Sequence, residues 1–129
     1  MIDWMRLVAV IQMLETGSCA DPAHARNGDC WGWLQISSGV VADYNKRHAA
    51  KFTHERVAES LQLSRLVATD HLIRFDKTPG HTLSVADALG IWRAGYGAWL
   101  NHALTKEQKD YVERGENLYN AERGIRKGR

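Results

Sequence analysis

Residues 4–15 read WMRLVAVIQMLE, and this stretch decides the expected fold. A stripe of side chains recurs in it at spacings of 4, 3 and 4 residues: Trp4, Val8, Ile11 and Glu15. Such spacing places the four side chains on one face of an α-helix. Gly17 is a natural residue to end that helix. We therefore predict a first helix over about residues 3–15 with this face toward the core.

Glu15 is the unusual member of the stripe because a carboxylate continues a row of apolar side chains. Carboxylates are rarely buried without a partner. Partial removal from water would raise the pKa of Glu15 and let it hold a proton near neutral pH, as a general acid for glycoside cleavage must. The alternative is a helix end whose carboxylate simply reaches solvent. Glu15 on its own favours that alternative, so the choice depends on the rest of the chain.

The remainder of the chain indicates helices joined by short polar segments. No stretch alternates apolar and polar residues for long, so we expect no large sheet. Segment 31–36 fits a strand-like piece or a buried turn. Further helices are predicted over about 39–44, 54–75, 85–92, 98–104 and 105–122, with Thr53, Ser84 and Thr105 as N-caps and breaks at 77–82 and 95–97. These features predict one mostly α domain over residues 1–123 and a basic tail, 124–129, that frays.

Composition narrows the classes of function. The 129 residues carry a formal net charge of +2 and have a pI near 8.6. This balance is too mild for a nucleic-acid-binding surface, and it is compatible with an anionic target such as a bacterial cell wall. The apolar run Leu7–Leu14 is too short for a membrane helix and lacks the flanks of a signal peptide. We expect no transmembrane segment, and delivery by a phage particle, a holin pore or a secretion system.

Cysteines and histidines give no metal pattern. A disulfide between Cys19 and Cys30 would close a small loop and suit a wall-facing protein, whereas two thiols are the alternative. Together with His24 they do not have a zinc spacing. The six histidines are scattered, and no two lie four residues apart. We expect neither a metal nor a cofactor.

Four short motifs follow one another along the chain: Glu15-Thr16-Gly17, Gly32-Trp33-Leu34-Gln35-Ile36, Trp92-Arg93-Ala94-Gly95 and Tyr111-Val112. This succession resembles the soluble lytic transglycosylase and goose-type lysozyme family. That family shows Glu-Ser-Gly, Gly-Leu-Met-Gln-Ile, Ala-Tyr-Asn-Ala-Gly and a tyrosine on the last helix, in this order and at similar spacing. The resemblance covers nearly the whole chain. It implies a lysozyme-like domain that cleaves the β-1,4 bond between N-acetylmuramic acid and N-acetylglucosamine in peptidoglycan.

The resemblance also implies roles for individual residues. Glu15 would protonate the glycosidic oxygen and then act as base. Gly32 and Gln35 would line the cleft, with the Gln35 amide offered to the sugar or to Glu15 and the missing Cβ of Gly32 leaving room for the glycan. The Tyr111 hydroxyl would contact Glu15. The other candidates for substrate binding are Arg93 and Gly95 of the third motif, and Trp31 and Tyr96, which each lie beside a glycine.

Arg93 is the main departure from the family pattern, because it places a permanent cation where the family has asparagine. It would change the substrate preference or bind a stem-peptide carboxylate. Thr16 keeps the hydroxyl of the family serine. No second carboxylate is obvious, and Asp29 and Asp43 are the candidates. The family route needs none and ends in a 1,6-anhydro product, whereas an aspartate that positions water would give hydrolysis. The sequence leaves both products open.

Two other functions compete with this one. A non-catalytic glycan-binding or virion structural module could retain the fold, and Arg93 favours it. A chitinase or chitosanase of the broader lysozyme-like group is the enzymatic alternative. For the main hypothesis we expect a monomer that acts on glycan strands in the periplasm or the extracellular wall, within a larger phage or secretion assembly where one delivers it.

Overall fold

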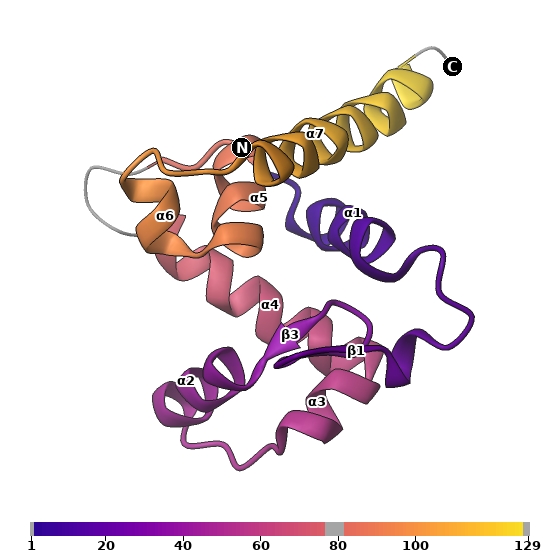
Figure 1. The fold of residues 1–129 in the computed structure, drawn as a ribbon. Helices are drawn as coiled ribbons and strands as arrows, with labels where there is room; N and C mark the ends of the chain where they lie inside the picture. Colours follow the sequence, from indigo (N-terminus) through magenta and orange to yellow (C-terminus); the bar gives the residue numbers. More distant parts are fainter. Residues whose placement is uncertain (1, 77–81, 128–129) are drawn as a thin grey trace. The chain divides into compact units, whose positions relative to one another are not determined.

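The computed structural model describes residues 2–76 and 82–127, and the chain is mostly helical, as the sequence predicted (Figure 1). Its elements in chain order are α1 (Trp4–Thr16), the 3-10 turn η1 (Pro22–His24), β1 (Arg26–Asn27), β2 (Cys30–Trp31), β3 (Ile36–Ser37), α2 (Ser38–His48), α3 (His54–Glu59), α4 (Leu61–Asp76), α5 (Val85–Ala94), α6 (Tyr96–Leu100) and α7 (Lys106–Lys127). None of the described helices is long and apolar enough to cross a membrane.

The chain groups into two compact units. Unit 1 contains the residues up to Leu14 and those from Phe75 onward, and unit 2 contains Glu15–Arg74. The single domain expected over residues 1–123 stays a prediction. Helix α7 continues to Lys127, beyond the end near Glu122 that the sequence indicated. Residues 128–129 of the tail lie outside the described residues, and so does most of the predicted break at 77–82.

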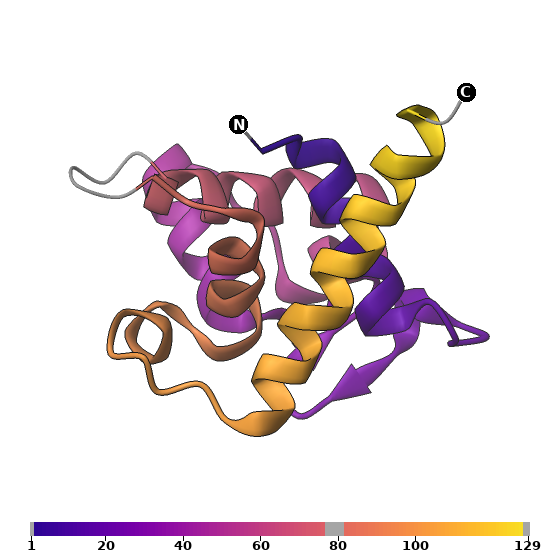
Figure 2. The same cartoon turned by 90° about the horizontal axis from the view of Figure 1, so that it is seen from above.

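In unit 1, α1 and α7 lie side by side (Figures 1 and 2). The Asp3 backbone N–H donates to the Tyr119 hydroxyl at 3.0 Å, and the Arg6 guanidinium lies 5.5 Å from the centre of the Tyr119 ring. Gly115 of α7 is buried, and a Cβ built on it would lie 2.6 Å from Leu89 Cδ1 and 3.1 Å from Leu14 Cδ1. Glycine at this position therefore allows α7 to approach both α1 and α5 closely.

The N-caps predicted at Ser84 and Thr105 are confirmed, and each belongs to a reciprocal capping box. Ser84 Oγ accepts from the Asp87 N–H at 3.1 Å, and Asp87 Oδ2 accepts from the Ser84 N–H at 3.0 Å. The same exchange joins Thr105 and Gln108, with distances of 2.8 and 3.2 Å. These local signals set helix starts because each one satisfies two backbone donors that a helix leaves open.

The tight turn predicted over residues 95–97 is wrong beyond its first residue. Gly95, with φ +93°, ends α5 and precedes α6, so Tyr96 and Gly97 are helical. Helix α6 ends at Leu100, short of the predicted Leu104. A positive φ at a single glycine is enough to redirect the chain between two helices, and the second glycine was not needed for it.

Unit 2 contains a small antiparallel sheet in the order β1-β2-β3. Arg26 pairs with Trp31, and Trp31 pairs with Ile36. The segment 31–36 is therefore a strand residue, a turn and a second strand residue, which combines the two alternatives left open by its sequence. Helix α2 follows directly, and the Ser37 hydroxyl caps it by accepting from Val40 N at 3.3 Å.

The single helix predicted over residues 54–75 is wrong, because the chain leaves the helix at Ser60 and forms α3 and α4. Ser60 has φ −97° and ψ 115°, and its hydroxyl accepts from Leu63 N at 3.1 Å. Serine competes with the helix in this way by capping the next turn. Apolar periodicity continues across the break, which is why the pattern alone missed it.

The break opens the last carbonyls of α3 to partners from other segments of unit 2, and those of Val57, Ala58 and Glu59 accept hydrogen bonds from them. Ser64 Oγ donates to the Val57 oxygen at 2.6 Å. The Trp33 backbone N–H donates to the Ala58 oxygen at 3.2 Å, and its indole Nε1–H donates to the Glu59 oxygen at 3.0 Å. The end of α3 is thereby joined to the turn between β2 and β3.

Candidate active site

Glu15 lies one residue before the end of α1 and is half-buried, whereas Val8 and Ile11 of its stripe are buried. The next residue, Thr16, is only 3% exposed, and its hydroxyl donates to the Trp33 carbonyl oxygen at 2.6 Å. A hydrogen bond between partners 17 residues apart fixes the end of α1 against the turn that follows β2. The Glu15 backbone and this turn are thus held together in unit 2.

The turn itself is built from two residues with left-handed backbone, Gly32 at φ +78° and Gln35 at φ +54°. Such a φ is strained for glutamine, and the surrounding contacts must hold it. Gln35 Nε2 donates to the Ala25 oxygen at 3.1 Å and to the Gly32 oxygen at 3.0 Å. The Gln35 side chain therefore closes its own turn.

Two roles expected in this turn need correction. Both N–H groups of the Gln35 amide are used inside the protein, so the group it can offer a ligand is its carbonyl oxygen. The space beside Gly32 is not open, because a Cβ there would lie 1.9 Å from the Ala58 oxygen. Glycine is required at this position by the backbone of α3, and not by an approaching glycan.

Trp31 is held in a stack rather than left open for a sugar. Its ring lies 3.9 Å from the His54 ring, with 9° between their planes, and the Arg26 guanidinium lies 3.8 Å from the ring centre. The indole N–H donates to the Gly28 oxygen at 2.9 Å. These contacts hold the indole firmly and leave it less free to stack on a ligand than its sequence context indicated.

Both candidates for the second carboxylate accept hydrogen bonds within the protein. Asp29 Oδ2 accepts from the Ser38 hydroxyl at 2.8 Å and from the Ser38 N–H at 3.0 Å, and these hydrogen bonds lower the pKa of Asp29. Asp43 Oδ2 accepts from Arg47 Nε at 2.8 Å and from Arg74 Nη1 at 2.7 Å. The hydrogen bond from Arg47 is the main cause of a lowered pKa at Asp43. Both carboxylates have structural partners.

The remaining candidates lie in unit 1, so they form a second group. The Arg93 guanidinium donates to the Glu107 carboxylate and lies 5.0 Å from the centre of the Tyr111 ring. Tyr111 is 2% exposed. The cation that departs from the family pattern thus has an acidic and an aromatic partner within unit 1. The expected contact between Tyr111 and Glu15 stays a prediction.

Gly95 and Tyr96 differ in how open they are. Gly95 is exposed, and a Cβ built on it would meet nothing within 4 Å. Tyr96 stacks on Phe75 with ring centres 4.6 Å apart and a plane angle of 12°, and Trp99 lies 5.7 Å away. Gly95 therefore leaves free space beside the chain, whereas the Tyr96 ring is already paired.

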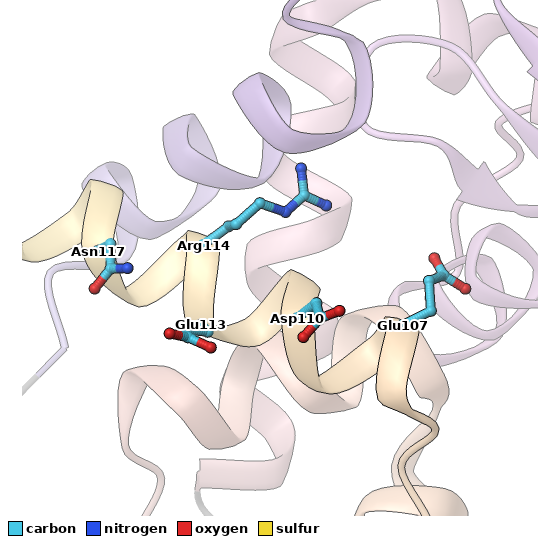
Figure 3. A pocket seen from close by; sticks show the side chains of 5 residues that line it. All are labelled: Glu107, Asp110, Glu113, Arg114 and Asn117. Carbon is cyan, nitrogen blue, oxygen red and sulfur yellow. The ribbon is translucent and has the colours of Figure 1, made fainter.

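A polar pocket of about 550 Å³ lies along α7 (Figure 3). Its lining residues are Glu107, Asp110, Glu113, Arg114 and Asn117. Glu107 and Arg114 extend to the same side of the helix in Figure 3. All five side chains are exposed and come from one helix, so the pocket is an open feature of the surface of α7. Because Glu107 also binds Arg93, this α7 pocket adjoins the third-motif residue.

The structure describes both cysteines, and no disulfide joins Cys19 and Cys30. Cys19 is exposed on the loop after α1, whereas Cys30 is half-buried in β2 opposite Asn27 and Ser37. Pairing of β2 on both sides fixes the position of Cys30, whereas the exposed loop sets that of Cys19. The structure therefore has two thiols and no disulfide between them, which is the second of the two alternatives stated from the sequence.

His24 has an acidic partner on each ring nitrogen. Its Nδ1 lies 3.0 Å from Asp21 Oδ2, and its Nε2 lies 2.6 Å from Glu59 Oε1. The hydrogen bond to Asp21, followed by the one to Glu59, raises the pKa of His24. The described side chains, those of residues 2–76 and 82–121, contain no group of three or more histidine, cysteine, aspartate or glutamate residues suited to a metal ion.

Sequence reasoning missed the residues that position the site. The bond from Thr16 to Trp33 and the partners of Trp33 on α3 join residues 17 to 26 positions apart, and no local pattern predicts such pairs. Glu107, the partner of Arg93, is similarly 14 residues away. Its spacing with Asp110 and Arg114 marks one helix face, but a polar stripe on a helix is usually only a solvated face.

No protein-family model matches this chain, and searches of curated proteins and of solved structures also found no match.

Proposed function

We propose that this protein cleaves peptidoglycan at the β-1,4 bond between N-acetylmuramic acid and N-acetylglucosamine, with Glu15 as general acid and base. The observation that carries the proposal is the hydrogen bond from Thr16 to the Trp33 carbonyl. It ties the end of the glutamate-bearing helix to the Gly32–Gln35 turn, so the first two motifs of the resemblance meet in unit 2. A catalytic group needs this kind of fixed backing to keep a productive geometry.

The chemistry requires one proton to be given and one to be taken. Glu15 would donate its proton to the glycosidic oxygen as the bond to C1 breaks, while the N-acetyl carbonyl oxygen of the substrate attacks C1. The resulting Glu15 carboxylate would then remove the proton of the C6 hydroxyl as O6 bonds to C1 and breaks the bond between C1 and the N-acetyl carbonyl oxygen. The product is a 1,6-anhydro sugar, and the carboxyl group is restored.

The partners of Asp29 and Asp43 favour this single-carboxylate route over hydrolysis. A carboxylate that activates water must accept the proton of that water. Asp43 is held between two guanidinium groups, which lower its pKa and make it a weak base. The lowered pKa of Asp29 has the same effect. We therefore propose the lytic transglycosylase outcome.

Unit 1 would contribute to glycan binding through the α7 pocket. Its carboxylates and the Asn117 amide can accept hydrogen bonds from sugar hydroxyls, and Arg114 can bind a carboxylate of the lactyl group or stem peptide. The resemblance adds Arg93, Gly95 and Tyr111 to this proposed surface. The place of action would be the periplasm or the extracellular wall, with the glycan strand as partner.

Mass spectrometry of purified peptidoglycan after digestion tests the proposal. We expect wild-type protein to release muropeptides that end in 1,6-anhydro sugars. Glu15→Gln should lose at least about a hundredfold in rate, because the amide cannot transfer a proton. Glu55→Gln is the matched control, since Glu55 is an exposed unit 2 glutamate whose one partner is Arg26 at 3.4 Å. It should cleave at the wild-type rate, and both variants should keep the wild-type melting temperature.

Other outcomes would identify the competing functions. If the protein binds the wall but leaves the glycan strands unchanged at high concentration, it is a non-catalytic module and not an enzyme. Products with a reducing end and no anhydro sugar would make the protein a lysozyme. Faster cleavage of chitin oligomers than of peptidoglycan would indicate a chitinase.

A further inference from the structure

A second pocket lies in unit 1, away from all candidate residues of the four motifs except Val112. It has a volume of about 390 Å³. Its lining comes from the start of α5, the end of α6 with the loop after it, and α7: Ala86, Asp87, Trp99, His102, Leu104, Lys109 and Val112. We call it the α5–α7 pocket. Helix α5 packs against both α6 and α7, so three elements of one unit build it.

The α5–α7 pocket has an apolar part formed by Trp99, Leu104 and Val112. All three side chains lie against Gly90 of α5, because a Cβ built there would lie 3.5 Å from Trp99 Cδ1, 3.5 Å from Leu104 Cδ1 and 3.9 Å from Val112 Cγ2. Glycine therefore lets the three side chains pack closely over the backbone of α5. Their outer surfaces offer an apolar lining to a ligand.

The wall of the pocket is fixed by hydrogen bonds. Trp99 Nε1 donates to Asp87 Oδ1 at 3.0 Å, and Asp87 Oδ2 accepts from the Ser84 N–H at 3.0 Å. The indole ring is therefore anchored to the first turn of α5. Both oxygens of the acidic lining residue are engaged by these bonds, so part of its charge is directed into the protein and away from the pocket.

Two further lining residues, Lys109 and His102, carry nitrogen donors. Among the side chains that the structure describes, those of residues 2–76 and 82–121, neither forms a hydrogen bond or an ion pair. Lysine offers three N–H donors to an anion. An apolar lining beside the Lys109 ammonium and the His102 ring nitrogens is suited to a ligand with an apolar body and one negative end.

We propose that the α5–α7 pocket binds a small carboxylate with a compact apolar body, its carboxylate on Lys109 and His102 and its methyl groups against Trp99, Leu104 and Val112. Such a group occurs at the end of an alanine-terminated peptide, as in a wall stem peptide, and in free short-chain carboxylic acids. The proposal does not depend on Glu15 or on glycan cleavage, so each can fail without the other.

Nuclear magnetic resonance of the tryptophan indoles provides the test, because the Trp99 Nε1–H resonance can be assigned with Trp99→Phe. The first probe is N-acetyl-D-alanyl-D-alanine, and its C-terminal amide is the neutral counterpart. We expect the acid to shift the Trp99 resonance saturably with a Kd on the order of 1 mM, and the amide to leave it in place. Equal shifts with both probes, or none with the acid, would overturn the proposal.

Isobutyrate is the second probe, and it distinguishes the two sources of the carboxylate. Binding of the dipeptide at least about tenfold tighter than isobutyrate supports a peptide end, because only the dipeptide extends beyond the apolar lining. Equal affinities support a free short-chain acid. Both outcomes preserve the shared chemistry, and absence of a shift with either acid contradicts it.

Variants of neighbouring lysines test the assigned contact. Lys109→Gln should weaken binding of the dipeptide about tenfold, as expected for loss of a charge-assisted hydrogen bond. Lys106→Gln, three residues earlier on the same helix and outside the pocket, should bind like wild type. Glu15→Gln should also bind like wild type. Equal weakening by both lysine variants would show general charge attraction and would contradict a specific site.

Discussion

At the scale of single residues, glycine has three different functions in this chain. Gly32 combines φ +78° with a carbonyl oxygen 1.9 Å from the place of its missing Cβ. At Gly115 the nearest atoms are the ends of leucine side chains. At Gly90 they stand at ordinary contact distances of 3.5 to 3.9 Å. One residue type thus permits a strained turn, a close helix crossing and the packing of three side chains over a helix backbone.

Alanine at these three positions should change the free energy of unfolding in a fixed order. Gly32→Ala should cost more than about 3 kcal/mol, because both the φ and the Ala58 backbone oppose a Cβ. Gly115→Ala should cost about 1–3 kcal/mol, since leucine ends can move. Gly90→Ala should instead raise the free energy of unfolding by about 0.5–1 kcal/mol, because alanine is more favourable than glycine in a helix interior. Urea unfolding measures all three, and a stable Gly32→Ala protein would show that the turn does not require glycine.

The two candidate carboxylates should respond to amide replacement in stability rather than in chemistry. Asp43→Asn removes the charge between Arg47 and Arg74 and should cost about 1–2 kcal/mol, reduced by partial exposure of the group. Asp29→Asn keeps an oxygen for Ser38, so we expect it to leave the free energy of unfolding nearly unchanged. Both should still form 1,6-anhydro products. A folded variant of either kind that no longer cleaves would identify the second catalytic group.

The sequence indicated which residues to consider for the candidate site, but it did not indicate their contacts. Glu15 could be chosen because a carboxylate at the end of an apolar stripe conflicts with helix patterning. The functions of Gln35 and Gly32 were wrong in part, because their partners, Ala25 and Ala58, come from other segments of the chain. A residue's type and spacing are visible in sequence, whereas the atoms that face it depend on tertiary packing.

At the scale of elements, local chemistry predicted helix starts and missed a helix break. The capping boxes at Ser84 and Thr105 are written within four residues, so they can be recognised directly. The break at Ser60 has no glycine or proline to signal it. It is stabilised by Trp33, whose donors compensate the carbonyls that α3 exposes. Stabilisation of that kind exists only after the chain has folded.

A network of charged side chains joins helices α2 and α4. His71, the residue after Asp70 of this network, has an unusual pKa. Arg47 Nη2 donates to Asp70 Oδ2 at 2.6 Å, and His48 Nε2 lies 2.8 Å from Asp70 Oδ1. Burial, with Arg74 nearby, lowers the pKa of His71 to about 4. The folded protein therefore favours neutral His71, whereas the unfolded chain protonates it near its ordinary value of 6.5.

Acid should destabilise the protein through His71 between pH 6.5 and 4. The unfolded chain binds the proton first in this window, so the free energy of unfolding falls as the pH falls. The loss at pH 5 relative to pH 7 should be about 2 kcal/mol. Urea titrations at pH 7 and pH 5 give this loss of unfolding free energy for wild type and for His71→Gln. The contribution of His71 is the loss in wild type minus the loss in the variant. The raised pKa of His24 makes the folded state more stable as the pH falls. This effect is the same in wild type and variant, so it cancels in the comparison. An equal loss in the variant would exclude His71 as the cause.

At the scale of the whole molecule, the mostly α character followed from periodicity alone, whereas the division into two units did not. The boundaries of these units lie inside the continuous helices α1 and α4. No loop, glycine run or change in composition marks those positions. Grouping of this kind depends on contacts between distant segments, which a single sequence does not contain.

The protein should be a monomer in solution. Among the described residues, four large apolar side chains are markedly exposed: Met5, Met13, Leu66 and Leu100. They come from three different helices, α1, α4 and α6. Stable interfaces bury on the order of 1,000 Å² or more around a connected apolar centre. Light scattering should give a mass near 14.6 kDa at micromolar concentration. A value twice as large would require a self-association surface.

The indole proton of Trp33 can report on the opening of the turn beside Glu15. Its amide and indole protons both point into carbonyls of α3, and its carbonyl oxygen receives the Thr16 hydroxyl. Protons held in this way exchange with deuterium only when the local structure opens. The indole proton of Trp33 should therefore exchange at the rate at which the Gly32–Gln35 turn separates from α3. Following that one proton with and without a glycan would measure how much a ligand tightens the wall next to Glu15.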